Sequence, residues 1–200
     1  MGLFGKSSSP SSSSSSSSTA SSILVLDTAN YRNNTIAGPD GIPLYWIESD
    51  GKNTLATKPI SVYKASSNEA GRELLAVLDF KTFKASTLQY KEDIKELKEV
   101  MPRKSWHNAG RMMLTPIGEC KWHANTGIPN LANPEGQVIA RYIMNRPTAK
   151  SKFLTNTSIE PKFEISSNGL EILDWIIIGW IVTAHDIEAE FGQWAPEYSM

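Results

Sequence analysis

The sequence predicts a mainly β protein in which about 12 antiparallel strands close into a barrel or sandwich around one hydrophobic C-terminal helix. Three observations lead to this prediction. From Ile23 onward the 200-residue chain consists of short apolar or alternating runs with turn residues between them at close intervals. No helical segments alternate with these runs, as a parallel sheet would require. The most hydrophobic passage, LEILDWIIIGWIVTAHDIE at 170–188, comes near the end of the chain.

The predicted strands follow one another through hairpin-sized connections with turn sequences such as GPDG and SDGK. One segment, 91–101, breaks the pattern: it is rich in good helix formers, with Ile94, Leu97 and Met101 at helical spacing, and Pro102 follows it. It is therefore predicted to be a short surface helix. The predicted strands span 23–28, 43–48, 60–64, 73–80, 85–90, 110–117, 119–124, 137–144, 152–156 and 161–166.

The N-terminal region has a different composition from the rest. Ser7–Ser22 contains 13 serines among its 16 residues, which offers too little apolar surface to offset the entropy lost on ordering. The chain is thus predicted to consist of a disordered leader at 1–22, a barrel domain at 23–192 and a tail at 193–200.

Three structures compete for the hydrophobic passage: a membrane span, a buried strand and a buried helix. Its apolar part, from Trp175 to Ala184, is only ten residues long. A helix of that length is about 15 Å long, whereas a bilayer core of about 30 Å needs about 20 apolar residues, so no transmembrane span is expected. Asn168 and Glu171 have the spacing of a helix N-cap and its capping-box partner, which favours a helix over a strand.

Apolar side chains point in every direction around this predicted helix, so protein must surround it. The predicted strands are the available container, and Gly179 would let one wall approach closely. The helix residues expected to lie in the interior are Trp175, Ile176, Ile178, Gly179, Trp180 and Val182.

This arrangement resembles the tubby-like superfamily, which includes the tubby proteins, the phospholipid scramblases and the LURP-one-related proteins. The Ser-rich leader and the phrases RMMLTPIGECKWHA (111–124), GQVIARYI (136–143) and LEILDWIIIGWIV (170–182) are similar to a fungal domain family of this superfamily whose function is unassigned. The resemblance covers residues 23–190 and implies a tubby-like barrel around a central helix.

The resemblance transfers no functional residue. Tubby proteins bind phosphoinositide head groups through basic residues on the barrel surface, but their lysine and arginine motif has no match in this sequence. Scramblases are similar in having a calcium-binding segment and a terminal helix with a basic tail. Here the chain after Ala184 is acidic, which argues against that role.

Charge is distributed unevenly along the chain. The net charge of −1 argues against a nucleic-acid partner attracted by the overall charge of the protein. The segment Met101–Lys152, however, has eight basic and two acidic residues. If these basic side chains share one surface, they would hold an anionic phospholipid head group; if the strands scatter them, they would not. The candidate patch consists of Arg103, Lys104, Arg111, Lys121, Arg141 and Arg146.

No catalytic constellation is visible. Cys120 and His123 form a C-x-x-H pair, but this spacing puts them on opposite faces of a strand, and a zinc site needs three or four protein ligands. No metal, cofactor or catalytic residue is therefore expected. The single cysteine and the lack of an apolar signal segment indicate an intracellular, cytoplasmic protein.

Three functional hypotheses remain open. The first is a non-enzymatic module that binds anionic phospholipid at a membrane surface. The alternatives are a protein-interaction scaffold and an enzyme with an unrecognised site.

Overall fold

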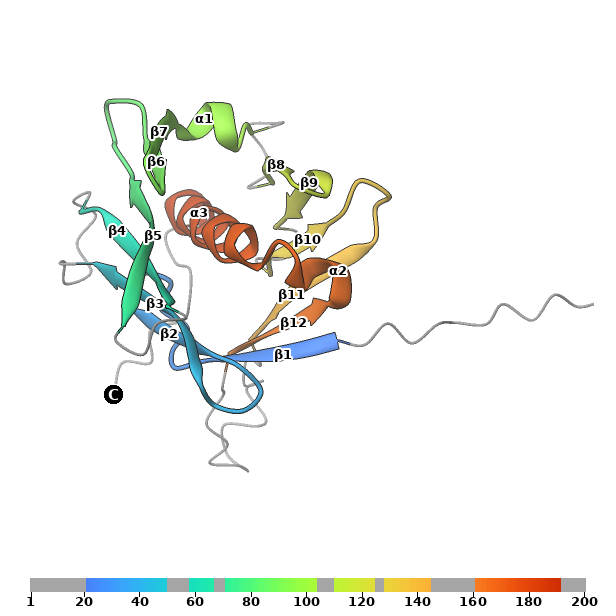
Figure 1. The fold of residues 1–200 in the computed structure, drawn as a ribbon. Coiled ribbons are helices and arrows are strands. Elements are labelled where there is room, and N and C mark those ends of the chain that lie inside the picture. Colours follow the sequence, from blue (N-terminus) through green and yellow to red (C-terminus); the bar gives the residue numbers. More distant parts are fainter. Residues whose placement is uncertain are drawn as a thin grey trace, which may run out of the picture.

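The structure, a computed structural model, describes residues 21–49, 58–66, 71–103, 110–124, 128–144 and 161–191. In this part of the chain, 12 strands form one antiparallel sheet in the order β7-β6-β5-β4-β3-β2-β1-β12-β11-β10-β9-β8 (Figure 1). The strands are β1 (Ser21–Leu26), β2 (Asn34–Ala37), β3 (Pro43–Ser49), β4 (Ile60–Ala65), β5 (Arg72–Asp79), β6 (Thr87–Tyr90), β7 (Asp93–Glu96), β8 (Met112–Thr115), β9 (Gly118–His123), β10 (Asn130–Ala132), β11 (Val138–Ile143) and β12 (Lys162–Ser166). The helices are α1 (Leu97–Val100), α2 (Ser167–Leu170) and α3 (Leu173–Phe191).

The sheet curves around α3, which lies in its centre (Figure 1). Every residue from Ile176 to Ala184 is buried, including Trp180 at 0% exposure. Inward-facing side chains of the strands complete the core, and each fully buried aliphatic or aromatic side chain contributes about 1.5–3 kcal/mol relative to an exposed one. The prediction of a mainly β protein with an enclosed C-terminal helix is confirmed.

Gly179 lets β9 approach α3 closely. A Cβ atom built on this glycine would lie 2.1 Å from Nε1 of Trp122, a fully buried side chain of β9. The expectation that Gly179 lets one wall of the sheet approach the helix closely is therefore confirmed. The group that approaches is the indole ring of Trp122.

The predicted closure of the barrel is not found. Among the described residues, β7 pairs along its length only with β6, and β8 only with β9, so the sheet is open between them. A single bridge, Arg103 to Arg111, spans one end of the gap. The reason lies in β7, because Asp93 and Lys95 are on the face of the strand turned toward the interior, and closing the sheet would bury both charges.

The predicted surface helix at 91–101 is wrong over its first half. Lys91 adopts a positive φ of 56° in the turn after β6, and Asp93–Glu96 forms β7 instead. Only the four residues of α1 are helical. Pairing with β6 overrides the helix propensity of these residues, as tertiary context commonly does.

Several boundaries also differ from the prediction. Ser21 and Ser22, assigned to the leader, begin β1 and pair with Ser166 and Ile165 of β12. The strands β2 and β10 had not been predicted. The remaining leader, the tail at 193–200 and the predicted strand at 152–156 lie outside the described residues.

The entry to the central helix differs from the predicted capping box. Ser166 is the N-cap of α2, and its hydroxyl oxygen accepts a hydrogen bond of 3.2 Å from the backbone N–H of Gly169. The chain then turns and α3 begins at Leu173. Asn168 lies within α2 and Glu171 is the C-cap residue of α2, so they do not form the predicted capping box.

Candidate functional site

Arg111, the most buried of the described members of the predicted basic patch, binds the central helix. Its Nε and Nη2 donate to the carboxylate oxygens of Asp186 in α3 at 2.5 and 3.0 Å, and its Nη1 donates to the carbonyl of Met101 at 2.7 Å. Arg103 adds a second ion pair to Asp186 at 2.5 Å. Asp186 is itself 2% exposed and Arg111 is buried with it, whereas the side chain of Arg103 is 40% exposed, so this ionic cluster reaches from the core to the surface.

Burial alone would raise the pKa of Asp186. The neighbouring His185, Arg111 and Arg103 lower it, and their combined effect holds the pKa of this carboxyl well below its usual range. Asp186 is therefore ionised at neutral pH and fastens the C-terminal half of α3 to the segments around β8.

The other members of the predicted patch lie elsewhere. Lys121 alternates with the buried Cys120 and Trp122 in β9 and thus lies on the outer face of the sheet. Arg141 is exposed on β11, opposite Glu164 of β12. Lys104 and Arg146 lie outside the described residues. The four described members are thus divided between an internal cluster and two outer strand positions.

Further polar contacts hold the helix at both ends. Asp174 accepts a hydrogen bond of 2.5 Å from the hydroxyl of Tyr45 and one of 2.8 Å from Lys64. The carboxylate of Glu188 accepts hydrogen bonds from the hydroxyl of Tyr31 and from Arg32. Burial, followed by the neighbouring Asp174, raises the pKa of Tyr45 far above its usual range, so this phenol stays protonated and donates.

The C-x-x-H pair does not converge. Cys120 is buried under the sheet, whereas His123 lies on the outer side of the same strand. Burial raises the pKa of the Cys120 thiol, which disfavours the thiolate form that binds metals. No group of three metal-binding side chains occurs among the residues that the structure describes.

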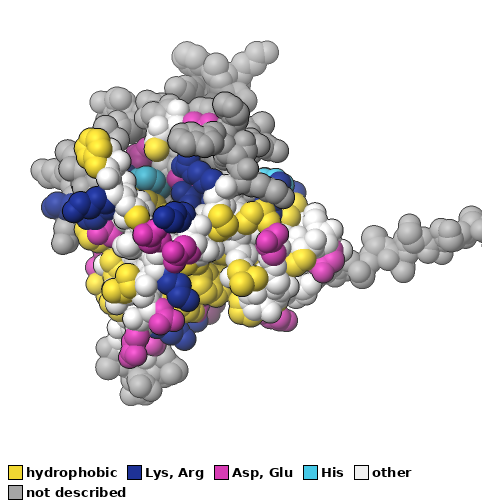
Figure 2. Space-filling view, turned by 90° about the horizontal axis from the view of Figure 1, so that it is seen from above, with side chains coloured by type: hydrophobic (Ala, Val, Ile, Leu, Met, Phe, Trp, Pro, Cys, Tyr) yellow, Lys and Arg dark blue, Asp and Glu magenta, His cyan; other side chains and the backbone are white. Residues whose placement is uncertain are grey.

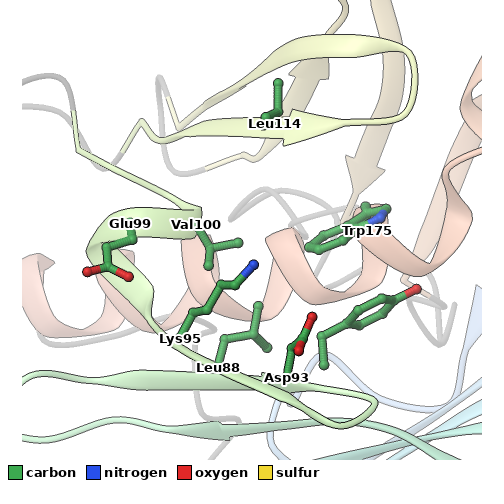
Figure 3. A pocket seen from close by; sticks show the side chains of 8 residues that line it. Leu88, Asp93, Lys95, Glu99, Val100, Leu114 and Trp175 are labelled. Atoms are coloured by element: carbon green, nitrogen blue, oxygen red, sulfur yellow. The ribbon is translucent and has the colours of Figure 1, made fainter.

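The gap between β7 and β8, named the seam here, contains a pocket of about 480 Å³ (Figure 3). The hairpin of β6 and β7 forms one wall and β8 forms the other, with α3 as the floor. Its lining residues are Leu88, Tyr90, Asp93, Lys95, Glu99, Val100, Leu114 and Trp175.

Trp175 provides the aromatic floor of the pocket. It had been predicted as a core residue, but it is only partly buried because the sheet is open above it. The ring of Tyr90 packs beside it, with centroids 4.6 Å apart and a tilt of 32°. Burial and then the charge of Asp174 raise the pKa of Tyr90, so its hydroxyl is protonated at neutral pH.

Three charged residues line the pocket, Asp93 and Lys95 of β7 and Glu99 of α1. Leu114, on the opposite wall, is 74% exposed although it is a large aliphatic residue. Figure 2 looks down on this side of the molecule, where hydrophobic side chains lie beside acidic and basic ones. The site can therefore bury an apolar group and leave charged neighbours around its rim.

The backbone at the seam is also available for binding. The N–H of Met112 donates to the carbonyl of Pro102 at 3.0 Å, so it points away from β9. Because alternate residues of a strand point their backbone groups to the same side, the N–H and C=O of Leu114 also face the seam. No residue in the described ranges pairs with Leu114 on that side. The same alternation directs the N–H and C=O of Ile94 away from β6.

Sequence reasoning missed the seam because it assigned 91–101 to a helix. The signal that could have revealed it is the alternation in β7, where Asp93 and Lys95 face inward and Ile94, 67% exposed, faces out. Inward-facing charges are a common device for leaving a sheet edge unpaired.

The loop between β5 and β6 carries a second unusual feature. Phe83 is 97% exposed, the highest exposure among the large hydrophobic side chains that the structure describes. Lys81 and Lys84 on either side of it are exposed as well. Lys81 also pairs with Asp79 at 2.8 Å.

The fold and the site define a small, mainly β module with an open sheet, a central helix and a ligand-sized pocket at the sheet edges. The chain belongs to the family described as a family of unknown function (DUF6593), which matches residues 29–188. The prediction of a family of unassigned function is confirmed, whereas membership of the tubby-like superfamily is not.

Two further comparisons add little. No protein with a curated description matches the sequence. A solved structure of a protein from Arabidopsis thaliana matches 86% of this chain and 92% of its own, at 11% identity and a TM-score of 0.29, a likeness too low to support an inference. None of the helices in the described part of the chain has the length and hydropathy that crossing a membrane requires.

Proposed function

We propose that the protein is a non-enzymatic binding module and that the seam pocket is its ligand site. The observation that carries the proposal is the partly buried Trp175, which forms an aromatic floor between two unpaired sheet edges. The volume of about 480 Å³ is in the usual range of ligand pockets. Its lining supplies apolar surface and charge rather than a nucleophile held by a base, which favours binding over catalysis.

The test is a titration with p-cresol, a small aromatic probe, monitored by NMR of protein labelled with ¹⁵N-tryptophan. We expect a saturable shift of the indole N–H signal of Trp175, identified with the Trp175→Phe variant. Trp46 is the internal control because it lies on β3, which contributes no residue to the pocket lining. Its ring instead packs 4.4 Å from the guanidinium of Arg72. Equal shifts of both indoles, or none at Trp175, would remove the proposal.

Binding to an anionic membrane is a second candidate, and the exposed Phe83 between two lysines favours it. An aromatic side chain inserts into the interfacial region of a bilayer, and each nearby lysine adds about 1 kcal/mol on an anionic surface. We place this membrane contact at the Phe83 loop rather than at the six-residue basic patch, because two members of that patch, Arg103 and Arg111, already form ion pairs with Asp186.

Vesicle flotation tests this second candidate. Vesicles of phosphatidylcholine with phosphatidylserine should carry the wild-type protein upward at low salt and release it at high salt. Phe83→Ser should abolish flotation. Ile42→Ser is the matched control, because Ile42 is an exposed loop residue, at 60%, and the charged residue nearest to it in the sequence is the acidic Asp40 rather than a lysine. Flotation of Phe83→Ser at the wild-type level would exclude the loop as a membrane contact.

A further inference from the structure

The seam has the backbone chemistry of a strand-binding site as well as the shape of a pocket. We propose that the ligand is an extended peptide segment of a partner protein, which adds to the edge of β8 as an antiparallel strand and places alternate side chains over Trp175. This inference rests on the proposed function of the seam and names the class of its ligand.

The chain itself already pairs with the first residues along this edge of β8. Pro102 and Arg103 lie beside the start of β8, where Arg103 and Arg111 form an antiparallel bridge and Pro102 accepts the N–H of Met112. The ladder then stops, because the preceding residues belong to α1. The next donor and acceptor on this side of β8 are those of Leu114, so a partner strand would continue a pairing for which this edge is already arranged.

The pleat of the sheet determines which ligand side chains enter the pocket. Met113 and Thr115 of β8 are buried, so their face of the strand is turned toward the core. In a strand paired with β8, the residue opposite Leu114 would share the outer face of Leu114. The residues before and after it would point inward, over Trp175. The ligand is therefore expected to have apolar side chains at two positions separated by one residue.

The charges on the opposite wall set a further preference. The charged residues that line the pocket are Asp93 and Lys95 of β7 and Glu99 of α1, an excess of one negative charge. A basic residue next to the apolar pair would be attracted to this wall, whereas an acidic one would be repelled.

The β7 edge of a second copy of the chain fits the seam less well than a foreign peptide. The other free edge that a copy could offer is β7, whose inward positions are the charged Asp93 and Lys95. Pairing that edge with β8 would press both charges against Trp175, at a desolvation cost that the peptide avoids.

A matched pair of variants tests the backbone contact. Leu114→Pro removes the N–H that faces the seam and leaves the hydrogen bonds to β9 in place, because those are made by Met113 and Thr115. Leu114→Ala retains the N–H and removes most of the side chain. Circular dichroism and urea unfolding of both variants establish that the sheet is intact.

The experiment is a selection of displayed ten-residue random peptides on the full-length protein, followed by measurement of Kd for the enriched peptides. We expect an apolar-x-apolar pattern with a neighbouring lysine or arginine. Leu114→Pro should raise Kd about tenfold, the effect of losing one hydrogen bond, and Leu114→Ala should raise it less. N-methylation along the peptide should weaken binding at every second amide.

Two outcomes would overturn the inference. One is that the selected peptides bind Leu114→Pro as tightly as wild type or show no alternation on N-methylation. The other is that no peptide is enriched. If p-cresol still shifts the Trp175 signal in either case, the pocket stands as a ligand site and only its assignment to peptide strands fails. If p-cresol shifts nothing, the proposed function fails as well.

Discussion

Replacing Gly179 by alanine gives a sharp test of how the strands enclose α3. In an exposed helix this change would stabilise the protein by up to about 1 kcal/mol, because alanine has the higher helix propensity. Here the new Cβ would lie 2.1 Å from Nε1 and 2.8 Å from Cε2 of Trp122, far inside the ordinary contact range of 3.4–4 Å. Trp122 is 0% exposed, so the indole is surrounded by protein and cannot swing out into solvent without opening the core.

We therefore expect Gly179→Ala to lower the free energy of unfolding by about 1–3 kcal/mol, the usual cost of overpacking a core. Urea unfolding followed by tryptophan fluorescence and circular dichroism measures it. Gly71→Ala is the control, because a Cβ at Gly71 would meet nothing within 4 Å, and it should change the free energy by less than about 0.5 kcal/mol.

The double-mutant cycle identifies the cause. Trp122→Leu alone should destabilise the protein, since it removes most of a buried side chain. In that background the clash is gone, and Gly179→Ala should become neutral or stabilising. If Gly179→Ala stabilises the wild-type protein by about 1 kcal/mol, β9 does not pack on α3 at this glycine and the reasoning is refuted.

Three further predictions concern the ionic cluster at Asp186 and the buried Cys120. Asp186→Asn should cost about 3 kcal/mol in urea unfolding at pH 7, because it leaves the buried guanidinium of Arg111 without its countercharge; an unchanged midpoint would contradict the ionic cluster. Since the pKa of Asp186 is lowered in the folded state, its contribution is present above its unfolded pKa of about 4 and is lost as the pH falls further, so the wild type should lose more stability than Asp186→Asn between pH 5 and pH 3. Cys120 should react with a disulfide reagent at pH 8 only at the rate of unfolding, because burial shields its thiol and raises its pKa, and rapid labelling would contradict this.

The sequence predicted the parts of the fold that depend on local pattern. Alternating runs predicted most of the strands, and the apolar surface all round 175–184 predicted an enclosed helix. The error at β7 has a physical cause. Ile94, Leu97 and Met101 have helical spacing, while the competing signal, inward-facing Asp93 and Lys95, consists of charges at positions where a strand pattern calls for apolar residues.

The candidate site was beyond reach of the sequence because it depends on long-range pairing. Arg111 was assigned to a surface patch, and the carboxylate that captures it, that of Asp186, lies 75 residues further along the chain. The seam likewise brings together α3 and the edge strands at opposite ends of the sheet order. Trp175 is accessible only because β7 and β8 lie on either side of it without pairing with each other.

Hydrogen exchange of individual backbone amides, measured by NMR, tests the open sheet around a buried helix most directly. The amides of α3 from Ile176 to Ala184 should be among the slowest in the protein. Along β8, the amides of Met113 and Thr115 should exchange slowly, while that of Leu114, which faces the seam, should exchange rapidly. Protection of Leu114 equal to that of its two neighbours would mean that the sheet is closed, and rapid exchange throughout α3 would mean that the helix is not enclosed.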